Sequence, residues 1–249
     1  MLVDVHAHLY EEEFSQDLEQ VIERAKSKLY CIICNGTNIE TNKKVLELSK
    51  KYKIIKAALG LYPLDAENLS EKEIKKEFDF IKKHKKEIIG LGEVGLDFKF
   101  GKNKDLQIQV FNDFIELGKK LGLPLIIHSR GAESDVIKIL EENKFSNVVL
   151  HSFNGNLKLV KLAEKNNINF SIPPLIVRST HFQELVKDLS ITKILTETDA
   201  PYLGPYKDQR NEPIFVEEVI KKISEIKNIS KEETEKNIFM NFQKIFSLN

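Results

Sequence analysis

Short apolar runs alternate along the chain with longer stretches in which apolar residues recur every three or four positions among lysines and glutamates. Apolar runs of this length are typical of buried strands, and the longer spacing is typical of amphipathic helices. Eight strands are expected, at residues 2–8, 30–35, 54–60, 88–95, 125–128, 148–151, 169–172 and 194–198. Helices are expected at residues 15–28, 40–53, 70–86, 105–121, 134–143, 157–166, 180–189, 213–226 and 230–246.

The order of these elements predicts the fold class. Two helix starts are supported by a serine with a glutamate three residues later, at Ser70 and Ser230. Eight strand-then-helix units in 249 residues predict an α/β fold, a (β/α)₈ TIM barrel with an additional C-terminal helix. An open doubly wound sheet is disfavoured because no G-x-G-x-x-G motif follows the first strand. Without a Gly/Ser linker or low-complexity block, residues 1–249 are expected to form a single domain.

Charge and cysteine content narrow the classes of function. The chain has 38 basic and 38 acidic residues, so a polyanion such as DNA would have to be bound by local contacts. Cys31 and Cys34 would point to opposite faces of a strand, which favours two buried small residues over a disulfide or zinc site. The N-terminus lacks the pattern of a signal peptide, and no apolar run reaches the roughly 20 residues of a membrane span. We therefore expect a cytoplasmic protein with no membrane association and no obligate protein partner.

Six side chains of the metal-binding types follow or end the expected strands: His6, His8, Glu93, His128, His151 and Asp199. In a barrel these strand ends meet at one mouth, where active sites are built. Residues two apart share a face of a strand, so both members of the His6–His8 pair can point inward. A lone histidine is more often a hydrogen-bonded core or surface group, but four of the six histidines occupy such ends. His84 lies in a lysine-rich helix and is expected in solvent, whereas His181 follows the seventh strand as a substrate contact or an ordinary loop residue.

This set of side chains suggests hydrolytic chemistry. Neutral imidazoles with carboxylates suit Zn²⁺, Mn²⁺, Co²⁺ or Fe²⁺, and Mg²⁺ could occupy the carboxylate-rich half. Four histidines and two carboxylates are too many for one catalytic ion with an open position. They suffice for two ions that share a bridging carboxylate, an arrangement that activates water for attack on a phosphodiester or carbonyl.

Five motifs in order resemble those of the TatD family of metal-dependent hydrolases, within the amidohydrolase-like barrels, over essentially the whole chain. Residues 4–9 read D-V-H-A-H-L and residues 92–97 read G-E-V-G-L-D. The sequence L-P-L-I-I-H-S-R follows at 123–130 and H-S-F-N-G at 151–155. The last motif is E-T-D-A-P-Y-L at 197–203, with R-N-E-P at 210–213.

The resemblance implies roles for the six ligand-type residues. His6, His8 and Asp199 would bind one divalent ion, His128 and His151 would bind a second, and Glu93 would bridge the two. The ions would be Mg²⁺, Mn²⁺ or Zn²⁺. Asp199 would also orient or deprotonate the attacking water, so that Asp199 and Glu93 are the expected catalytic residues.

Three residues are candidates for substrate binding. Arg130 shares a face with His128 and could grip a phosphate, or could instead form an ion pair at the rim with Asp97 or Glu197. Arg210, in the loop after the eighth strand, is a second candidate for a phosphate. Tyr62 could stack a base, as could Phe98 or Tyr202. Asn211 is expected to order the loop that carries Arg210.

The chain departs from the family pattern near the expected substrate. Tyr62 stands where the family usually has the histidine of G-x-H-P, and Gly131 stands where an acidic residue is common. Pro173 and Pro174 follow the seventh strand, where relatives favour a Ser/Gly-rich turn. These changes leave the six ligand-type residues intact and affect the loops that set specificity.

Three functions are consistent with these features. The first is a deoxyribonuclease that cuts DNA phosphodiester bonds, in single strands or at 3′ ends, with a metal-activated water. The second is a hydrolase of a C–N or ester bond in a small molecule or aminoacyl adduct. The third is a metal-binding barrel that serves as a partner-binding scaffold, because a fold alone does not fix a function.

Overall fold

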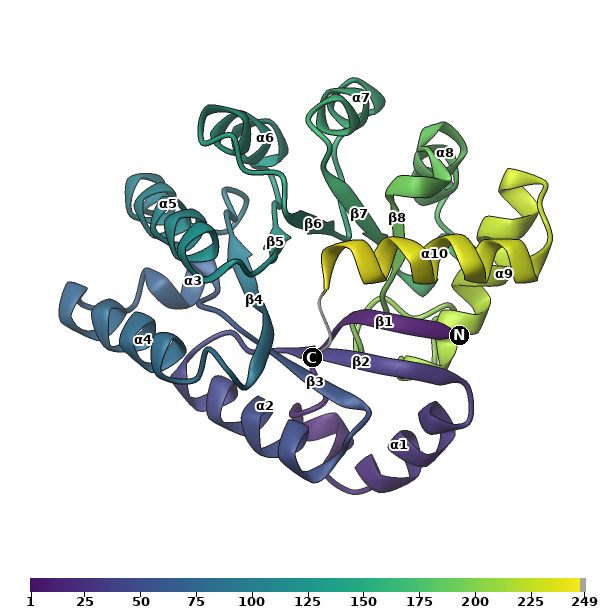
Figure 1. Ribbon diagram of the computed structural model, residues 1–249, viewed down its shortest axis with the longest axis horizontal. Coiled ribbons are helices and arrows are strands. Elements are labelled where there is room, and N and C mark those ends of the chain that lie inside the picture. The colour runs from purple at the N-terminus through teal and green to yellow at the C-terminus, as the bar shows by residue number, and fades with distance from the viewer. Residues whose placement is uncertain (247–249) are drawn as a thin grey trace.

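The computed structural model describes residues 1–246, in which eight parallel strands form one sheet in the order of the chain (Figure 1). All eight expected strands are confirmed, with ends that differ by a few residues. The strands are β1 (Leu2–Ala7), β2 (Leu29–Asn35), β3 (Ile55–Leu59), β4 (Ile88–Gly95), β5 (Leu125–His128), β6 (Val148–His151), β7 (Asn169–Ile172) and β8 (Ile194–Thr196). Nearly every strand residue is buried, which explains why the strands appear in the sequence as continuous apolar runs.

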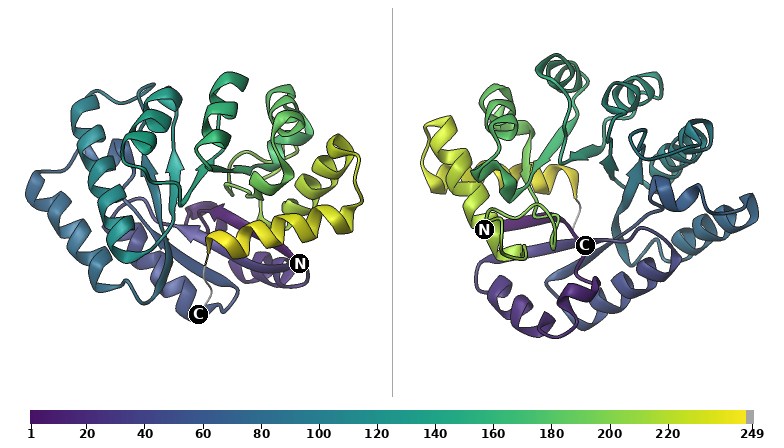
Figure 2. Two further views of the ribbon diagram at one scale, coloured as in Figure 1. Left: turned by 45° about the horizontal axis from the view of Figure 1, so that its top comes forward. Right: turned by 180° about the vertical axis from the view of Figure 1, so that it is seen from behind.

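Helices surround the strands, as Figures 1 and 2 show, so the predicted (β/α)₈ barrel with a further C-terminal helix is confirmed. They are α1 (Leu18–Lys26), α2 (Ile39–Lys51), α3 (Pro63–Ala66), α4 (Glu71–Lys83), α5 (Lys104–Leu121), α6 (Glu133–Glu142), α7 (Leu157–Lys165), α8 (Thr180–Asp188), α9 (Val216–Lys227) and α10 (Lys231–Ile245). Ser70 begins α4 with the expected reciprocal cap: its hydroxyl accepts from the Glu73 amide, and its amide donates to the Glu73 carboxylate. No helix within residues 1–246 is both long and apolar enough to cross a bilayer. Residues 247–249 of the expected domain lie outside the described residues.

Sequence periodicity missed several short helical turns. The short helix α3 and three 3₁₀ turns, at Glu12–Phe14, Pro174–Val177 and Ile191–Lys193, lie between the longer elements. A fourth 3₁₀ turn, Pro213–Phe215, forms the start of the helix expected at 213–226 and leads directly into α9. The expected helix at 15–28 is shorter, because the chain first makes the 3₁₀ turn that buries Phe14. Elements of three or four residues are too short to show a helical period.

The barrel closes between its first and last strands through side chains rather than a regular ladder. One isolated bridge joins Ala7 to Ala200. The buried Thr196 hydroxyl donates to the Val3 carbonyl at 2.6 Å, and the buried Asp4 carboxyl accepts from the Thr198 amide at 2.9 Å. The contact between β1 and β8 is therefore made by residues that are neighbours, in sequence, of the candidate ligands at the ends of these two strands.

Helix α10 lies at the opposite end of the barrel from those ligands. Its buried Asn241 donates to the carbonyls of Ile191 and Ile194, at the start of β8. Phe246, just after α10, lies beside Gly90 near the start of β4. Figure 2 shows α10 running across this end beside β1. Because α10 covers the N-terminal ends of the strands, the C-terminal ends are left for the candidate site.

Candidate metal centre

The structure brings all six predicted ligand-type residues together at the C-terminal mouth of the barrel. His6 lies in β1, Glu93 in β4, and His128 and His151 are the last residues of β5 and β6. His8 follows β1 and Asp199 follows β8. These side chains come from five strand ends and are almost entirely buried. Their spacing in the sequence gives no local reason for this convergence; the closed barrel supplies it.

Four donor atoms form a first group around His6 and His8. The two Nε2 atoms lie 3.0 Å apart. Asp199 Oδ1 is 3.5 Å from the Nε2 of His6 and 3.3 Å from that of His8. Glu93 Oε2 lies 3.5 Å and 3.4 Å from the same two nitrogens. All four atoms therefore face one common point.

The second oxygen of Glu93 faces a second group. Glu93 Oε1 lies 3.0 Å from His128 Nδ1 and 3.1 Å from His151 Nε2, and these two nitrogens are 3.2 Å apart. His151 also stacks on His6, with ring centroids 4.0 Å apart and planes 5° from parallel. The two groups are thus contiguous, and Glu93 contributes one oxygen to each.

These distances and donor types fit a divalent cation. Nitrogen and oxygen ligands lie about 2.1 Å from Zn²⁺, so neighbouring ligands in a tetrahedral shell are about 3.4 Å apart. The separations in the first group match this spacing. Two imidazole Nε2 lone pairs facing one another at 3.0 Å repel unless a proton or a cation lies between them. Groups of His6, His8 and Asp199, and of His6, Glu93 and His151, can therefore hold metal.

Hydrogen bonds behind the imidazoles fix which nitrogen faces the centre. His8 Nδ1 lies 3.1 Å from the Asn35 carbonyl, so a proton on Nδ1 leaves the Nε2 lone pair free. His128 Nε2 lies 3.1 Å from Asp97 Oδ2, which places the His128 proton there and leaves Nδ1 free. His151 has the buried Glu197 carboxylate 3.8 Å behind its Nδ1. Asp97 and Glu197 therefore face histidines, and neither pairs with Arg130.

One glycine allows β4 to approach β5 at the centre. Gly95 has a φ of +133°, and a Cβ atom there would lie 2.0 Å from the carbonyl oxygen of His128. A side chain at this position would therefore displace His128 and the Asp97 that follows.

Asp199 is presented by a turn that a buried asparagine holds in place. Asp199 has a φ of +56°, and its amide donates to the His6 carbonyl at 2.7 Å. Asn211 Nδ2 donates to the carbonyls of Thr198 and Tyr202, on either side of this turn, at 2.7 Å and 2.5 Å. We expected Asn211 to order its own loop; these hydrogen bonds show that it also fixes the position of a candidate ligand.

The buried groups perturb one another's pKa values. Burial alone would raise the pKa of Glu93, but the imidazoles of His151, His128 and His6 hold it well below its usual range. Burial lowers the pKa of His6 to about 4. Burial opposes protonation of His151 as well, yet Glu93 and Glu197 raise its pKa to about 10. The carboxylates therefore stabilise a positively charged histidine in this centre. The same negative charge favours binding of a metal cation.

A cavity of about 410 Å³ opens above these ligands. Tyr62, Arg130 and Tyr202 are among the residues that line it. The Tyr62 hydroxyl donates to Asp97 Oδ2 at 3.1 Å and lies 3.3 Å from His128 Nε2. Tyr202 is 49% exposed. Phe98 does not line the cavity; its half-buried ring lies under the Lys104 ammonium, 4.6 Å from its centroid.

The two candidate arginines are placed differently. Arg130 is the one lysine or arginine among the cavity-lining residues, and within residues 1–246 it makes no ion pair. We expected Arg210 also to face a phosphate, but its guanidinium lies on Asp17 instead. The two nitrogens are 2.8 Å and 2.6 Å from the carboxylate oxygens, and the guanidinium packs 4.5 Å from the Phe14 ring centroid. A phosphate contact by Arg210 would require this pair to break.

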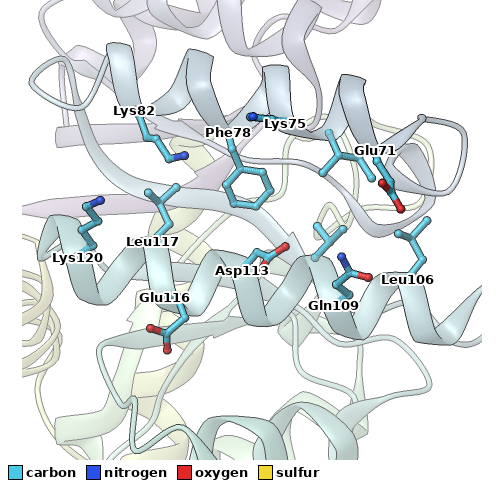
Figure 3. A pocket seen from close by; sticks show the side chains of 12 residues that line it. Glu71, Lys75, Phe78, Lys82, Leu106, Gln109, Asp113, Glu116, Leu117 and Lys120 are labelled. Carbon is cyan, nitrogen blue, oxygen red and sulfur yellow. The ribbon is translucent and has the colours of Figure 1, made fainter.

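A wider groove, of about 580 Å³, lies between α4 and α5 (Figure 3). Phe78 of α4 points into it, and lysines and acidic residues of both helices, such as Lys82 and Asp113, line its sides. It contains no histidine, and its charged groups form no cluster of the kind that holds metal. The smaller cavity at the strand ends is therefore the candidate site.

The remaining singled-out residues lie outside the cavity. His84 is partly buried at the end of α4, where its Nδ1 lies 2.6 Å from Glu87, so the expectation of a fully solvated side chain was wrong. His181 Nε2 donates to the Phe153 carbonyl at 3.1 Å. Cys31 and Cys34 are buried and unbonded to each other, as expected.

Comparisons with known proteins identify the family of the chain. The family described as TatD related DNase matches residues 3–247. The chain is 36% identical to the uncharacterized metal-dependent hydrolase YabD of Bacillus subtilis, over all of both chains. It is 35% identical to human deoxyribonuclease TATDN3, over 98% of this chain and 94% of that one. The crystal structure of the TatD homologue YJJV from Escherichia coli superposes with a TM-score of 0.91 at 25% identity, covering 100% of this chain and 98% of the other. With a family match over nearly its whole length, this chain belongs to the TatD family of metal-dependent hydrolases.

Proposed function

We propose that this protein is a deoxyribonuclease that hydrolyses phosphodiester bonds of DNA, in single strands or at 3′ ends, with two divalent ions bound at the mouth of the barrel. The main support for this proposal is that the two carboxylate oxygens of Glu93 face two different groups of imidazole nitrogens. One oxygen serves His6 and His8, and the other serves His128 and His151. The name of human deoxyribonuclease TATDN3, a relative along the full length, supports DNA as substrate.

The proposed ligands follow from this division. His6, His8 and Asp199 would hold one ion, and His128 and His151 the other, with Glu93 between them. Bound Mg²⁺, Mn²⁺ or Zn²⁺ would supply positive charge that polarises a phosphodiester oxygen and lowers the pKa of a water molecule. The mixed nitrogen and oxygen donors suit Mn²⁺ or Zn²⁺ throughout, and Mg²⁺ best where carboxylates dominate.

The residues around the ligands have distinct proposed roles in the reaction. Water oxygen attacks phosphorus, the bond from phosphorus to the leaving nucleoside oxygen breaks, and Asp199 accepts the proton of the attacking water. Arg130 offers two parallel N–H groups to the phosphate oxygens. Tyr62 holds Asp97 and, through it, the tautomer of His128, while its ring forms part of the cavity wall.

The test is cleavage of labelled single-stranded and duplex DNA by purified protein with Mg²⁺ or Mn²⁺. His6→Ala and Glu93→Ala are expected to lose bound metal and cleavage together. His84→Ala, which lies outside the cavity, is the matched histidine control and should keep both. An Asp199→Asn protein that cuts as well as the wild type would exclude the proposed chemistry. Full activity in Glu93→Ala would exclude the shared carboxylate.

A second candidate, hydrolysis of a small amide, lactone or aminoacyl ester, is favoured by one observation. Glu11 and Asp65 line the cavity together with a single cation, Arg130. Such a wall suits hydroxyl or amino groups better than a second phosphate. A panel of acyl substrates and simple phosphodiesters separates the two functions, because far faster turnover of an acyl substrate would favour the second.

A further inference from the structure

An exposed aromatic ring lies just outside the cavity, on the loop between β4 and α5. Phe100 is 56% exposed. The guanidinium carbon of Arg130 lies 5.8 Å from the centroid of the Phe100 ring, and the Lys99 ammonium lies 5.4 Å from it. Arg130 also lines the cavity, so the Phe100 ring lies next to the edge of the cavity. A large apolar side chain exposed to water beside two cations is suited to bind a ligand with both a flat face and negative charge.

The cations in this loop and beside it are free to meet such a ligand. Lys99, Lys102, Lys104 and Arg130 are exposed, and within residues 1–246 their side chains form no ion pairs. Some lysines elsewhere pair with a glutamate one turn away, as Lys119 does with Glu116 at 2.6 Å. These cations are therefore available to a phosphate without first breaking an ion pair.

The acidic groups near this loop are already engaged. Glu67 accepts from the amides of Lys102 and Asn103 at 2.9 Å and 2.8 Å. Glu133 accepts from the Gly131 amide at 3.2 Å, and the buried Asp97 is shared between His128 and the loop amides. Asp105, which is close to the loop in sequence, lies exposed in the first turn of α5 and accepts no such hydrogen bond. These acids hold the loop in place through its backbone amides and do not engage its lysine side chains.

The loop is fixed before any ligand binds. The amides of Lys99 and Phe100 donate to Asp97 Oδ1 at 3.1 Å and 3.0 Å. The Phe98 amide donates to the Arg130 carbonyl at 3.0 Å. Asp97 also contacts His128 through its other oxygen, so the position of Phe100 is tied to the ligand group itself. A preformed surface loses little conformational entropy on binding.

The side of the cavity next to β1 carries an acidic residue. Glu11, in the segment that follows β1, lines the cavity there. A second aromatic, Tyr206, is 48% exposed in the loop after β8, where its ring packs against Phe215. Phosphates leaving the cavity would thus be favoured on the side of Phe100 and disfavoured beside Glu11.

We propose that Phe100 and Lys99, next to Arg130 at the edge of the cavity, form a subsite for a nucleotide of single-stranded DNA beyond the two that flank the scissile phosphodiester, with its base stacked on Phe100 and its phosphate held by Lys99. Stacking on an exposed aromatic ring accepts any base, and the cations follow the backbone, so the subsite has no sequence preference. The inference rests on the proposed nuclease function and extends it: the strand runs from the cavity over the β4–α5 loop.

The experiment measures binding rather than cleavage. Fluorescence anisotropy of labelled oligothymidylates of two and eight nucleotides is recorded with Ca²⁺ in place of Mg²⁺, and gels verify that the strands stay intact. Phe100→Ala is expected to weaken binding of the eight-mer by at least about fivefold, the lower end of the range for loss of one stack. Phe100→Trp should restore it. Binding of the dinucleotide, too short to reach the loop, should change less than about twofold.

Charge and position have their own controls. Lys99→Gln should reduce the slope of log affinity against log salt by about 0.7, as expected for one lost phosphate contact to a single strand. Lys86→Gln, an exposed lysine beyond the end of α4, should leave that slope unchanged. Tyr206→Ala removes a ring of similar exposure from the other side of the mouth, and should leave eight-mer affinity within about twofold.

Several outcomes would overturn the subsite: wild-type protein that binds no eight-mer, equal affinity of Phe100→Ala and wild type, or a loss in Tyr206→Ala alone. Cleavage by the wild type is measured in parallel with Mg²⁺ or Mn²⁺. If the wild type cleaves DNA but Phe100→Ala binds the eight-mer as well as the wild type does, the subsite is excluded and the nuclease function stands. If binding depends on Phe100 but the wild type does not cleave DNA, the nuclease function is excluded and the surface only binds the strand.

Discussion

Asp97 Oδ2 lies 3.1 Å from Nε2 of His128, while Asp97 Oδ1 accepts the amides of Lys99 and Phe100. One buried carboxylate thus orients an imidazole of the candidate metal centre with one oxygen and fixes the β4–α5 loop with the other. Burial alone would raise the pKa of Asp97, but His128 and the Phe100 amide hold it below its usual range. Asp97 therefore stays ionised and links the metal centre to the proposed strand-binding surface.

Asp97→Asn should weaken metal binding by about 10- to 100-fold, the usual effect of losing a hydrogen-bond partner behind a ligating histidine. The amide nitrogen of asparagine must face either the His128 proton or the two loop amides, so one side loses its acceptor. Calorimetric titration of metal-free protein with Mn²⁺ measures the effect. Asp65→Asn is the matched control, because Asp65 also lines the cavity but bonds Asn38 instead of a histidine. Equal Mn²⁺ affinity in the Asp97 and Asp65 variants would contradict the role of Asp97.

Asn211→Asp should lower the free energy of unfolding by about 2–3 kcal/mol, because a donor between two carbonyls becomes an acceptor in a buried position. Bound metal should fall with it, since the same hydrogen bonds hold the turn that presents Asp199. Urea unfolding in EDTA measures the first effect, and metal content after gel filtration the second. Asn237→Asp is the control: Asn237 donates to the Glu233 carbonyl on an exposed face of α10. The assignment fails if both variants change stability equally.

The fold and the ligand-type residues could be predicted because each has a local signature. Buried parallel strands are apolar on both faces, and their last residues are the polar ones that reach the mouth. His151 could be placed at a strand end from its neighbours alone. What could not be read locally is which oxygen of Glu93 meets which imidazole, because that depends on strand register across the closed barrel.

The missed features depend on contacts between distant residues. Arg210 pairs with Asp17, 193 positions away, and nothing in the loop around Arg210 indicates this partner. Phe100 went unnoticed because an aromatic residue is ordinarily assigned to the core, whereas here it is exposed. Its flanking lysines, in the stretch F-K-F-G-K-N-K at 98–104, are the signal that could have indicated a surface role.

The Arg210–Asp17 pair predicts a pH dependence of stability. Arg210 lowers the pKa of Asp17 from its usual 3.8. A carboxylate with a depressed pKa stabilises the fold above its unfolded pKa, and this contribution is lost as the pH falls through the folded value. Asp17→Asn should therefore lower the free energy of unfolding by less than about 1 kcal/mol near pH 6, because both side chains of the pair are partly exposed to solvent. The difference in this free energy between variant and wild type should shrink below about pH 4. Urea titrations in EDTA at several pH values measure this difference.

Asp208→Asn, at an exposed carboxylate of the same loop, is the control for the Asp17 variant. It should leave the pH dependence as in the wild type. A difference between Asp17→Asn and wild type that stayed constant from pH 6 to pH 3 would show that the pair contributes through packing on Phe14 rather than through charge.

Phe242→Ala should separate the stability of the barrel from its metal centre. Phe242 is fully buried in α10, with its ring 5.3 Å from that of Phe246, at the end of the barrel opposite to the ligands. Loss of a buried phenyl ring costs about 3–5 kcal/mol, and Met240→Ala, at a residue 45% exposed on the same helix, should cost far less. Urea unfolding measures both. Because α10 packs at the end of the barrel opposite to the six ligands, the folded Phe242→Ala protein should still bind metal with wild-type stoichiometry; metal loss without a change in stability would mean that the two ends of the barrel are coupled.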